Sequence, residues 1–375
     1  MGEWKEYRLD EIAEILDYKR KPLSSMQRSV RRGEIPYYGA SGIIDYIDDY
    51  IFEGEHVLIS EDGENLRSRQ TPIAFLADGR FWVNNHAHII KSDYIHNRLI
   101  CYYFANLDLN PFLTGAVQPK LSQDSLMKIP IFLPKSIEDR KQIVSIIASL
   151  DDKIDLLHRE NETLEAMAET LFRKWFIEDA KDEWEEGTLD DILSIKGGTT
   201  PSTKEPKYWN GKIAWTSPRD VTSLNGIYLF DTDRKITEDG LKQISSGLLP
   251  AGTLLMSSRA PVGALAYAEI PLAINQGYIA IIDNKGYSKE FIYLWLKLNM
   301  DLVRSYSNGS TFMEISKSAF KALNIQIPPQ KNVEDFSKII KPLFNKIKLN
   351  EQQIINLGRI KNKILPKLMS NELKI

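Results

Sequence analysis

The sequence predicts an α+β protein built from two tandem copies of one domain, each followed by a long helix. Two pairs of segments carry this prediction. The chain reads GAVQPKLS over Gly115–Ser122 and GSTFMEIS over Gly309–Ser316, near the ends of its two halves. The halves also open alike, with EWKEYRLDEI from Glu3 and EWEEGTLDDI from Glu183. Such a repeat is too long for a solenoid unit, so we predict two domains related by pseudo-twofold symmetry.

A third pair of segments lies between these two. VNNHAHII over Val83–Ile90 aligns with AINQGYIA over Ala273–Ala280, which places Asn85 opposite Asn275. Because all matches keep the same order in both halves, a chance similarity at one place does not explain them.

Within each domain, short apolar runs bounded by glycine and proline predict strands, and longer apolar stretches predict helices. The predicted strands include residues 54–59, 70–75 and 252–256, and the predicted helices include 98–105 and 289–296. Cys101, in the first of these helices, is expected to be a buried small hydrophobe. The predicted divisions are a first domain over 1–135, a helix over 136–180, a second domain over 181–331 and a helix over 332–375.

The two long helices have start signals and heptad patterns. Ser136 and Asp139 form a capping box, and Asn332 and Asp335 supply a similar start to the second helix. Apolar residues then recur in coiled-coil seams of equal length. The first seam is Ile143, Ile147, Leu150, Ile154, Leu157, Asn161, Leu164, Ala168, Leu171 and Trp175. The second is Phe336, Ile340, Leu343, Ile347, Asn350, Ile354, Leu357, Lys361, Ile364 and Leu368.

The asparagines predict how the seams pair. In an antiparallel register Asn161 lies opposite Asn350, whereas parallel pairing would place Asn161 near Ile354. A buried unpaired amide costs about 1–3 kcal/mol, so the antiparallel register avoids two such penalties. We therefore predict an intramolecular antiparallel coiled coil.

The same register sets further expectations. Lys361 would lie beside Leu150 and extend toward Asp151 or Asp152. Five heptads at about 1.5 Å per residue give a rod of roughly 50 Å, longer than one turn of B-DNA at about 34–36 Å. The alternative is that each helix packs on its own domain.

Composition limits the class of protein. The chain has 375 residues, 43% of them hydrophobic, which is enough for two ordinary cores. Its single cysteine excludes an internal disulfide and a cysteine-based zinc site. No signal peptide or uninterrupted apolar span is visible, and Glu6 stands where a myristoylation motif needs serine or threonine. We therefore expect a cytoplasmic protein without membrane attachment.

Charge is informative in its distribution more than in its sum. The net charge of −3, from 48 basic and 51 acidic side chains, does not indicate a nucleic-acid binder. The segment Lys19–Arg32, however, is basic and contains no acid. Such a run can neutralise phosphates, and the alternative is a solvated basic loop.

The chain lacks a recognisable set of catalytic motifs. The Asn/Asp-Pro-Pro-Tyr/Phe tetrad of a methyltransferase is missing, because Asn110–Phe112 has one proline too few, and no phosphate-binding loop is present. Ser125–Lys128 matches Ser-x-x-Lys without the accompanying hydrolase elements. His86 and His88 alternate on a predicted strand and would face the same side. Without a third ligand, core or groove histidines are favoured over a metal site.

Taken together, these features resemble the specificity subunit of type I restriction–modification systems. The resemblance covers essentially the whole chain, and it rests on the order and duplication of motifs that are individually weak. In the first half they are QPKLS over Gln118–Ser122 and IPIFLP over Ile129–Pro134. The second half lacks the proline in Phe312–Ile315 but has GGTTP over Gly197–Pro201, SRAPVG over Ser258–Gly263 and NQG over Asn275–Gly277.

The resemblance implies a non-catalytic subunit with two target-recognition domains, each binding one half of a bipartite, asymmetric sequence in double-stranded DNA. It also implies that the helices act as spacer and docking platform for methyltransferase subunits, two of them, which carry S-adenosylmethionine and methylate adenine. A motor-nuclease subunit that uses ATP and Mg would join them. In this chain itself the resemblance implies no cofactor, and we expect no metal.

Base-reading residues are expected on loops, because Arg reads guanine and Asn or Gln reads adenine in the major groove. Asp62–Asn65 is a predicted tight turn that exposes the basic residues after it. The candidates in the first domain are Arg20, Lys21, Arg67, Arg69, Gln70 and His86. Those in the second are Thr199, Thr200, Arg219, Ser258, Arg259 and Gln276. Apolar residues outside the first seam are candidates for docking a methyltransferase subunit or for packing on their own domains, namely Ile137, Ile146, Leu156, Met167, Phe172 and Phe176.

Two other classes of function remain open from the sequence. One is a scaffold that joins two protein-binding domains without nucleic acid, for which no salt-dependent DNA binding is expected. The other is a free-standing DNA enzyme, which would be active by itself with S-adenosylmethionine, magnesium or ATP.

Overall fold

The computed structural model describes residues 3–115, 117–181, 183–259, 261–309, 313–370 and 372. Ala116, Ala260 and Ser310–Phe312, which belong to the predicted motifs, lie outside these ranges. The chain forms two compact units, one of Met1–Lys153 with Leu357–Ile375 and the other of Ile154–Asn356. We call them unit 1 and unit 2. Each unit contains one of the two repeats and a part of both long helices. The boundaries between the units therefore fall within the helices and not at their first residues.

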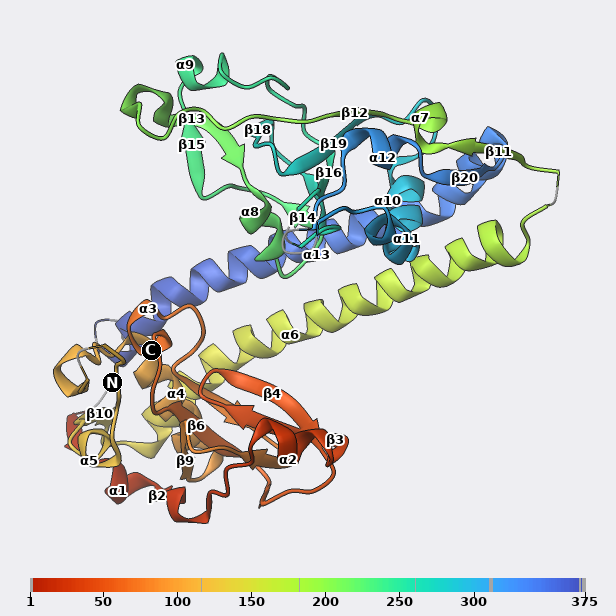
Figure 1. Ribbon diagram of the computed structural model, residues 1–375. Helices are drawn as coiled ribbons and strands as arrows, with labels where there is room; N and C mark the ends of the chain where they lie inside the picture. Colours follow the sequence, from red (N-terminus) through yellow and green to blue (C-terminus); the bar gives the residue numbers. More distant parts are fainter. Residues whose placement is uncertain are drawn as a thin grey trace. The chain divides into compact units, whose positions relative to one another are not determined.

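Unit 1 is built on two four-stranded sheets and a two-stranded ribbon (Figure 1). The sheets have the strand orders β2-β9-β6-β7 and β4-β3-β8-β5, and β1 pairs antiparallel with β10. The strands are β1 Trp4–Tyr7, β2 Glu14–Ile15, β3 Arg32–Gly39, β4 Gly42–Ile47, β5 Phe52–Glu53, β6 His56–Ser60, β7 Ala74–Ala77, β8 Arg80–Val83, β9 Ala87–Lys91 and β10 Ile131–Pro134. The helices are α1 Leu9–Ile12, η1 Asp17–Lys19, α2 Ser25–Ser29, α3 Asn65–Ser68, α4 Tyr94–Asn106, η2 Asn110–Phe112 and α5 Gln123–Leu126.

Unit 2 has the corresponding sheets, with strand orders β12-β19-β16-β17-β14 and β15-β13-β18, and its β11 pairs antiparallel with β20. The strands are β11 Glu185–Thr188, β12 Ser194–Lys196, β13 Trp209–Thr216, β14 Tyr228–Leu229, β15 Arg234–Ile236, β16 Leu254–Ser257, β17 Leu265–Ala268, β18 Leu272–Ile274, β19 Tyr278–Asp283 and β20 Asn324–Ile327. The helical segments are η3 Lys174–Glu178, α7 Leu189–Ile192, η4 Pro206–Tyr208, α8 Pro218–Thr222, α9 Glu238–Leu241, α10 Lys289–Leu298, α11 Met300–Ser305 and α12 Lys317–Lys321.

The central strand of each unit is buried on both faces. In β6, Val57 and Ile59 join one apolar core while Leu58 joins another. In β16, Leu254 and Leu255 divide in the same way between two cores. Side chains alternate across a strand, so a continuous apolar run is what a doubly covered strand requires. This explains why both strands appeared in the sequence as short apolar runs.

The duplicated segments fold alike. Ser122 Oγ accepts a hydrogen bond from Ser125 N at 3.2 Å and caps α5, and Ser316 Oγ accepts one from Ala319 N at 3.1 Å and caps α12. Each short helix leads into the strand that pairs with the opening strand of its repeat, β10 with β1 and β20 with β11. The repeat predicted from sequence is therefore also a repeat of structure.

The two long helices are α6, Ile137–Arg173, and α13, Gln330–Met369 (Figure 1). Ser136 Oγ accepts a hydrogen bond from Asp139 N at 3.3 Å, as the predicted capping box requires. The predicted start of the second helix is two residues late. Asn332 lies inside the first turn and its N–H bonds to Pro329 O at 2.9 Å, so the chain turns into the helix directly after Pro328-Pro329. Every predicted seam residue is buried or half-buried.

Within unit 2 the helices pair in the antiparallel register. Asn350 Nδ2 donates to Asn161 Oδ1 at 2.8 Å, and the ring of Phe336 lies 5.9 Å from that of Phe172. Within unit 1, Lys361 Nζ lies 2.5 Å from Asp151 Oδ1, the contact expected for the same register. Asn161 and Asn350 are both buried, so their mutual hydrogen bond satisfies groups that water does not reach.

Replacing Asn161 with leucine is therefore expected to lower the free energy of unfolding by about 1–3 kcal/mol, because Asn350 loses an acceptor and keeps only Glu160. The double variant Asn161→Leu/Asn350→Leu should recover part of this loss. A double-mutant cycle by chemical denaturation measures the coupling, and additive effects of the two single changes would contradict the pairing.

A buried carboxylate also ties α13 to β14. Glu351 accepts hydrogen bonds from Ile227 N at 2.8 Å and from Tyr228 N at 3.0 Å. A Cβ on Gly226 would lie 2.5 Å from Glu351 Cδ, so the approach requires glycine. Burial raises the pKa of Glu351 to about 7, against the effect of the two backbone hydrogen bonds and with a further upward contribution from Glu165 and Glu269.

No helix among the described residues is both long enough and apolar enough to cross a membrane.

Candidate nucleic-acid interface

Three segments meet at one end of β6 in unit 1. They are the residues after β6, the turn between β8 and β9, and the loop Thr114–Lys120. Glu61 N donates to His86 O at 2.9 Å and Leu121 N donates to Glu61 O at 2.7 Å, which joins all three. Thr114 and Lys120 exchange two backbone hydrogen bonds of 2.8 Å that close the loop.

Unit 2 repeats this arrangement bond for bond. Ser258 N donates to Gly277 O at 2.8 Å, and Ile315 N donates to Ser258 O at 3.0 Å. Asn308 and Glu314 exchange backbone hydrogen bonds of 2.9 and 3.0 Å that close the corresponding loop. The backbone framework is therefore the same in both units.

The side chains on this framework are different. The bridge that pairs Asp62 with Lys120 in unit 1 pairs Arg259 with Glu314 in unit 2. Arg259 Nη2 lies 3.0 Å from the Glu314 carboxylate, and Lys120 Nζ lies 3.1 Å from the neighbouring Glu61. On the same backbone framework, unit 2 thus has a base where unit 1 has an acid, and an acid where unit 1 has a base.

The turns correct the sequence alignment by one residue. Asn84 Oδ1 accepts a hydrogen bond from His86 N at 2.7 Å, and Asn275 Oδ1 accepts one from Gly277 N at 2.8 Å. Asn84 is therefore the equivalent of Asn275, and the predicted pairing of Asn85 with Asn275 was wrong. Two adjacent asparagines in the first repeat made both alignments possible from letters alone.

A buried hydrogen-bond network supports the turn and the loop of unit 1. His88 Nδ1 lies 2.5 Å from Asp17 Oδ2, and its Nε2 lies 2.8 Å from Leu121 O. Both neighbours are oxygen atoms, so each ring nitrogen has a hydrogen-bond partner. The other oxygen of Asp17 accepts a hydrogen bond from Ile89 N at 2.9 Å. This contact links η1, β9 and the residue that follows the loop.

Arg20 completes the network. Its Nη1 donates to Glu61 Oε2 at 2.5 Å and to Ala87 O at 3.0 Å, and its Nη2 lies 3.4 Å from Asp17 Oδ2. The Arg20 side chain is 17% exposed. We therefore assign it to the support of the site, although the sequence suggested a base reader.

Asp17, Glu61 and His88 together have the composition of a metal site, with potential ligand atoms within 4.8 Å of one another. Arg20 and Lys120 already supply positive charge to the carboxylates. Burial alone would raise the pKa of Glu61, but its hydrogen bond from Arg20, the charge of His88 and the contact with Lys120 hold that pKa below its ordinary value. The arrangement fits an ion-pair network better than a metal centre.

His86 and His88 do not share a site. His86 precedes β9 and is exposed, with Nδ1 2.8 Å from Asp62 Oδ2, whereas His88 is buried within the strand. The expected same-side alternation was wrong because the strand begins only at Ala87.

The other candidates of unit 1 divide into two groups. Arg69 donates to the carbonyls of Phe104 and Ala105 at the end of α4, which is a structural contact. Arg67 is exposed and donates to Gly115 O at 3.2 Å, and so lies against the loop. Lys21 and Gln70 are also exposed, and no ion pair of Lys21 is found among the described residues.

In unit 2, most candidates lie around the same turn and loop. Thr200 Oγ1 donates to Gln276 Oε1 at 2.6 Å, and both residues are exposed. Arg219, exposed, follows Pro218, whose ring lies close to Gly277. Two candidates have structural roles. Ser258 is 3% exposed, and Thr199 accepts from Ser245 N at 3.0 Å and donates to Gln243 O at 2.7 Å.

The basic run Lys19–Arg32 is largely neutralised by acids from elsewhere in unit 1. Arg28 pairs with Asp45 at 2.9 Å and its guanidinium lies 5.0 Å from the ring of Tyr37. Arg31 pairs with Asp48 at 2.9 Å. The acids follow the run by about a dozen residues or more, which is why the run appeared unpaired in the sequence.

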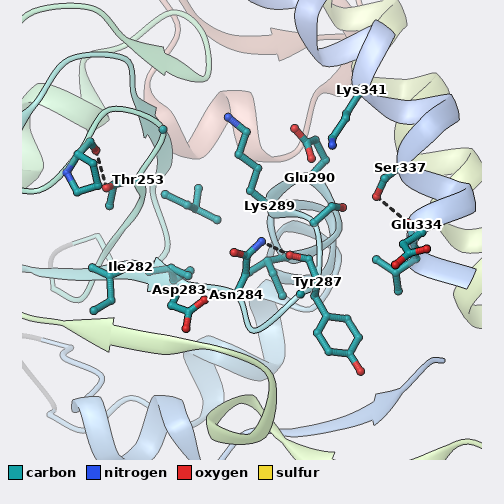
Figure 2. A pocket seen from close by; sticks show the side chains of 18 of the residues that line it. Thr253, Ile282, Asp283, Asn284, Tyr287, Lys289, Glu290, Glu334, Ser337 and Lys341 are labelled. Carbon is teal, nitrogen blue, oxygen red and sulfur yellow. Dashed lines mark hydrogen bonds between the residues drawn. The ribbon is translucent and has the colours of Figure 1, made fainter. Parts of the chain in front are cut away.

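A cavity of about 730 Å³ lies at the opposite ends of β16 and β19 from the turn. Figure 2 shows Lys289 and Glu290 of α10 and Lys341 of α13 among the side chains that line it. It is lined by residues before and within the first half of β16, so it is separate from the loops described above.

The burial of the docking candidates on α6 and η3 determines which of them a partner could contact. Phe172 and Phe176 are 1% and 8% exposed and their rings pack against that of Phe291 in the core of unit 2, so they are not available to a partner. Ile146 packs partly against the core of unit 1. Ile137, Leu156 and Met167 are 45%, 50% and 48% exposed.

The model of the family described as the type I restriction modification DNA specificity domain matches residues 1–166 and 181–359. The chain belongs to this family. It is 35% identical over 174 residues to the specificity subunit of type I restriction enzyme MjaIX from Methanocaldococcus jannaschii, over 46% of this chain and 40% of that protein. It is 41% identical over 149 residues to a putative type I restriction enzyme specificity subunit from Haemophilus influenzae, over 40% of this chain and 37% of that protein.

Both alignments span less than half of these specificity subunits. The crystal structure of a type I restriction–modification S subunit from M. genitalium shares the fold, with a TM-score of 0.62 and 17% identity over 98% of this chain and 96% of that one. The family and the two-domain α+β fold expected from the sequence are therefore confirmed.

Proposed function

We propose that this chain is the DNA sequence-specificity subunit of a type I restriction–modification complex and that each unit binds one half of a bipartite duplex target. The observation that carries the proposal is the duplicated framework of turn and loop. The same backbone bonds present Asp62 and Lys120 in one unit and Arg259 and Glu314 in the other. One scaffold with different polar side chains suits two half-sites of different sequence, which makes the target asymmetric.

The chain itself would be non-catalytic, and methylation would come from methyltransferase subunits that carry S-adenosylmethionine. We propose that such subunits dock on the long helices, where Leu156 and Met167 are exposed. A motor-nuclease subunit that uses ATP and Mg would join the complex. Exposed apolar side chains on a helix support the docking proposal.

Methylome sequencing tests the proposal in cells that contain this chain and its methyltransferase subunit, compared with cells that lack only this chain. Loss of a single bipartite methyladenine motif is the expected result. Identical methylation in both strains, with the methyltransferase shown to be expressed, would refute it.

A binding measurement separates DNA recognition from a scaffold role. The affinity of the complex for the identified duplex should fall linearly with salt on a logarithmic scale, because phosphate contacts release counterions. If the complex does not bind the duplex even at low salt, the scaffold role would be favoured.

A further inference from the structure

The turn in each unit places an exposed side chain at its tip, directly after an asparagine, and in unit 1 the next residue, His86, is exposed as well. In unit 1, Asn84 N donates to Tyr38 O at 3.0 Å while its side chain accepts from His86 N. In unit 2, Asn275 N donates to Thr216 O at 3.1 Å while its side chain accepts from Gly277 N. Asn84 and Asn275 are thus each fixed by one backbone and one side-chain hydrogen bond. The exposed residue that follows is Asn85 in unit 1 and Gln276 in unit 2.

Both tip residues carry a primary carboxamide. Their neighbours on the framework differ between the units, with His86 equivalent to Gly277 and Asp62 equivalent to Arg259. Thr200 holds Oε1 of Gln276 at 2.6 Å, and Arg20 Nη1 lies 3.5 Å from the backbone oxygen of Asn85. Gln276 is therefore held through its side-chain amide, whereas Asn85 is positioned through its backbone.

A carboxamide offers a donor and an acceptor side by side. This pair matches N7 and N6 of adenine in the major groove, which makes Asn and Gln the side chains that read that base. Resting on the proposed function, we propose that Asn85 and Gln276 are equivalent specificity-determining residues, each contacting an adenine in its own half-site. The alignment from sequence had concealed this equivalence, since it matched Gln276 with His86.

The experiment is methylome sequencing of cells in which the chain carries Asn85→Ala or Gln276→Ala, with its methyltransferase subunit present. Asn85→Ala should reduce discrimination about tenfold or more at one adenine-containing position of one half-site. Gln276→Ala should do so in the other half-site only. Gln326→Ala, an exposed amide on β20, is the matched control and should leave the motif unchanged.

Unchanged preference at every position in both variants would overturn the inference while leaving the proposed function intact. If a variant methylates too little DNA to sequence, competition binding of the purified complex to duplexes with single base-pair changes measures the same discrimination. Wild-type discrimination in that assay would also overturn the inference. Failure of the wild-type chain to specify any motif would instead refute the proposed function.

Discussion

Replacing Arg20 with alanine is expected to lower the free energy of unfolding of unit 1 by about 3–5 kcal/mol. The guanidinium lies between Glu61 and Asp17, whose side chains are 11% and 5% exposed. Without it, the two carboxylates remain in a site that water barely reaches, with Lys120 beside Glu61 and the His88 ring beside Asp17. Removing one partner of a buried ion pair costs more than the pair contributes, because the remaining charge stays desolvated.

Arg31→Ala is the matched control from the same basic run. Arg31 pairs with Asp48 and Asp49, whose side chains are half exposed, so its loss should cost at most about 1 kcal/mol. Hydrogen exchange of the peptides that contain β6 and β9 in the full chain gives the local free energy of opening. Equal effects of the two substitutions would contradict the network assigned to Arg20.

The sequence was sufficient for features that recur along the chain. The repeat, the two long helices and the Asn161–Asn350 contact depend on spacing, because heptad periodicity determines which face of a helix is buried. The apolar runs at β6 and β16 likewise follow from strands covered on both faces. In each case the residues that the local pattern predicts to be buried are the ones that pack in the core or in the seam.

The support of the candidate interface could not be predicted because its partners are distant in the chain. Arg20 meets Glu61 and Asn85, which lie 41 and 65 residues away. An arginine in a basic run looks the same whether it faces a phosphate or an internal carboxylate. Only the fold separates Arg20 from the exposed Lys21 beside it.

The burial of the proposed docking residues could not be predicted from the sequence either. Heptad reasoning places Phe172 and Phe176 outside the seam, but it does not say what covers the rest of the helix. Phe291 of α10 covers them in unit 2. Leu156 and Met167 are exposed among the described residues and stay candidates for a partner.

Unit 2 is expected to lose stability as the pH rises through about 7, and Glu351 is the reason. Its folded pKa is about 7, above the value of about 4.3 for an unfolded glutamate. The folded state therefore holds the proton more tightly. The stabilisation is fully present below about pH 4.3 and is lost as the pH rises through the folded pKa, a change of about 4 kcal/mol at most.

Glu351→Gln should remove this pH dependence. The amide keeps one acceptor oxygen but turns a donor toward the second backbone N–H, so the variant should be less stable by an amount that does not vary with pH. A histidine side chain ordinarily titrates close to this range, so a pH dependence of the wild type alone does not isolate Glu351. The quantity to measure is therefore the difference between wild type and variant in hydrogen exchange of the β14 peptides between pH 5 and pH 8.

Gly226→Ala gives an independent test of the same contact. The new Cβ would lie 2.5 Å from Glu351 Cδ, so the carboxyl group must move away from Ile227 N and Tyr228 N. This should leave two buried donors unpaired, at about 1–3 kcal/mol each, and let water reach the carboxyl group and lower its pKa. Loss of stability together with loss of the pH dependence is expected. An undiminished pH dependence in Gly226→Ala would mean that burial at this contact is not what raises the pKa of Glu351.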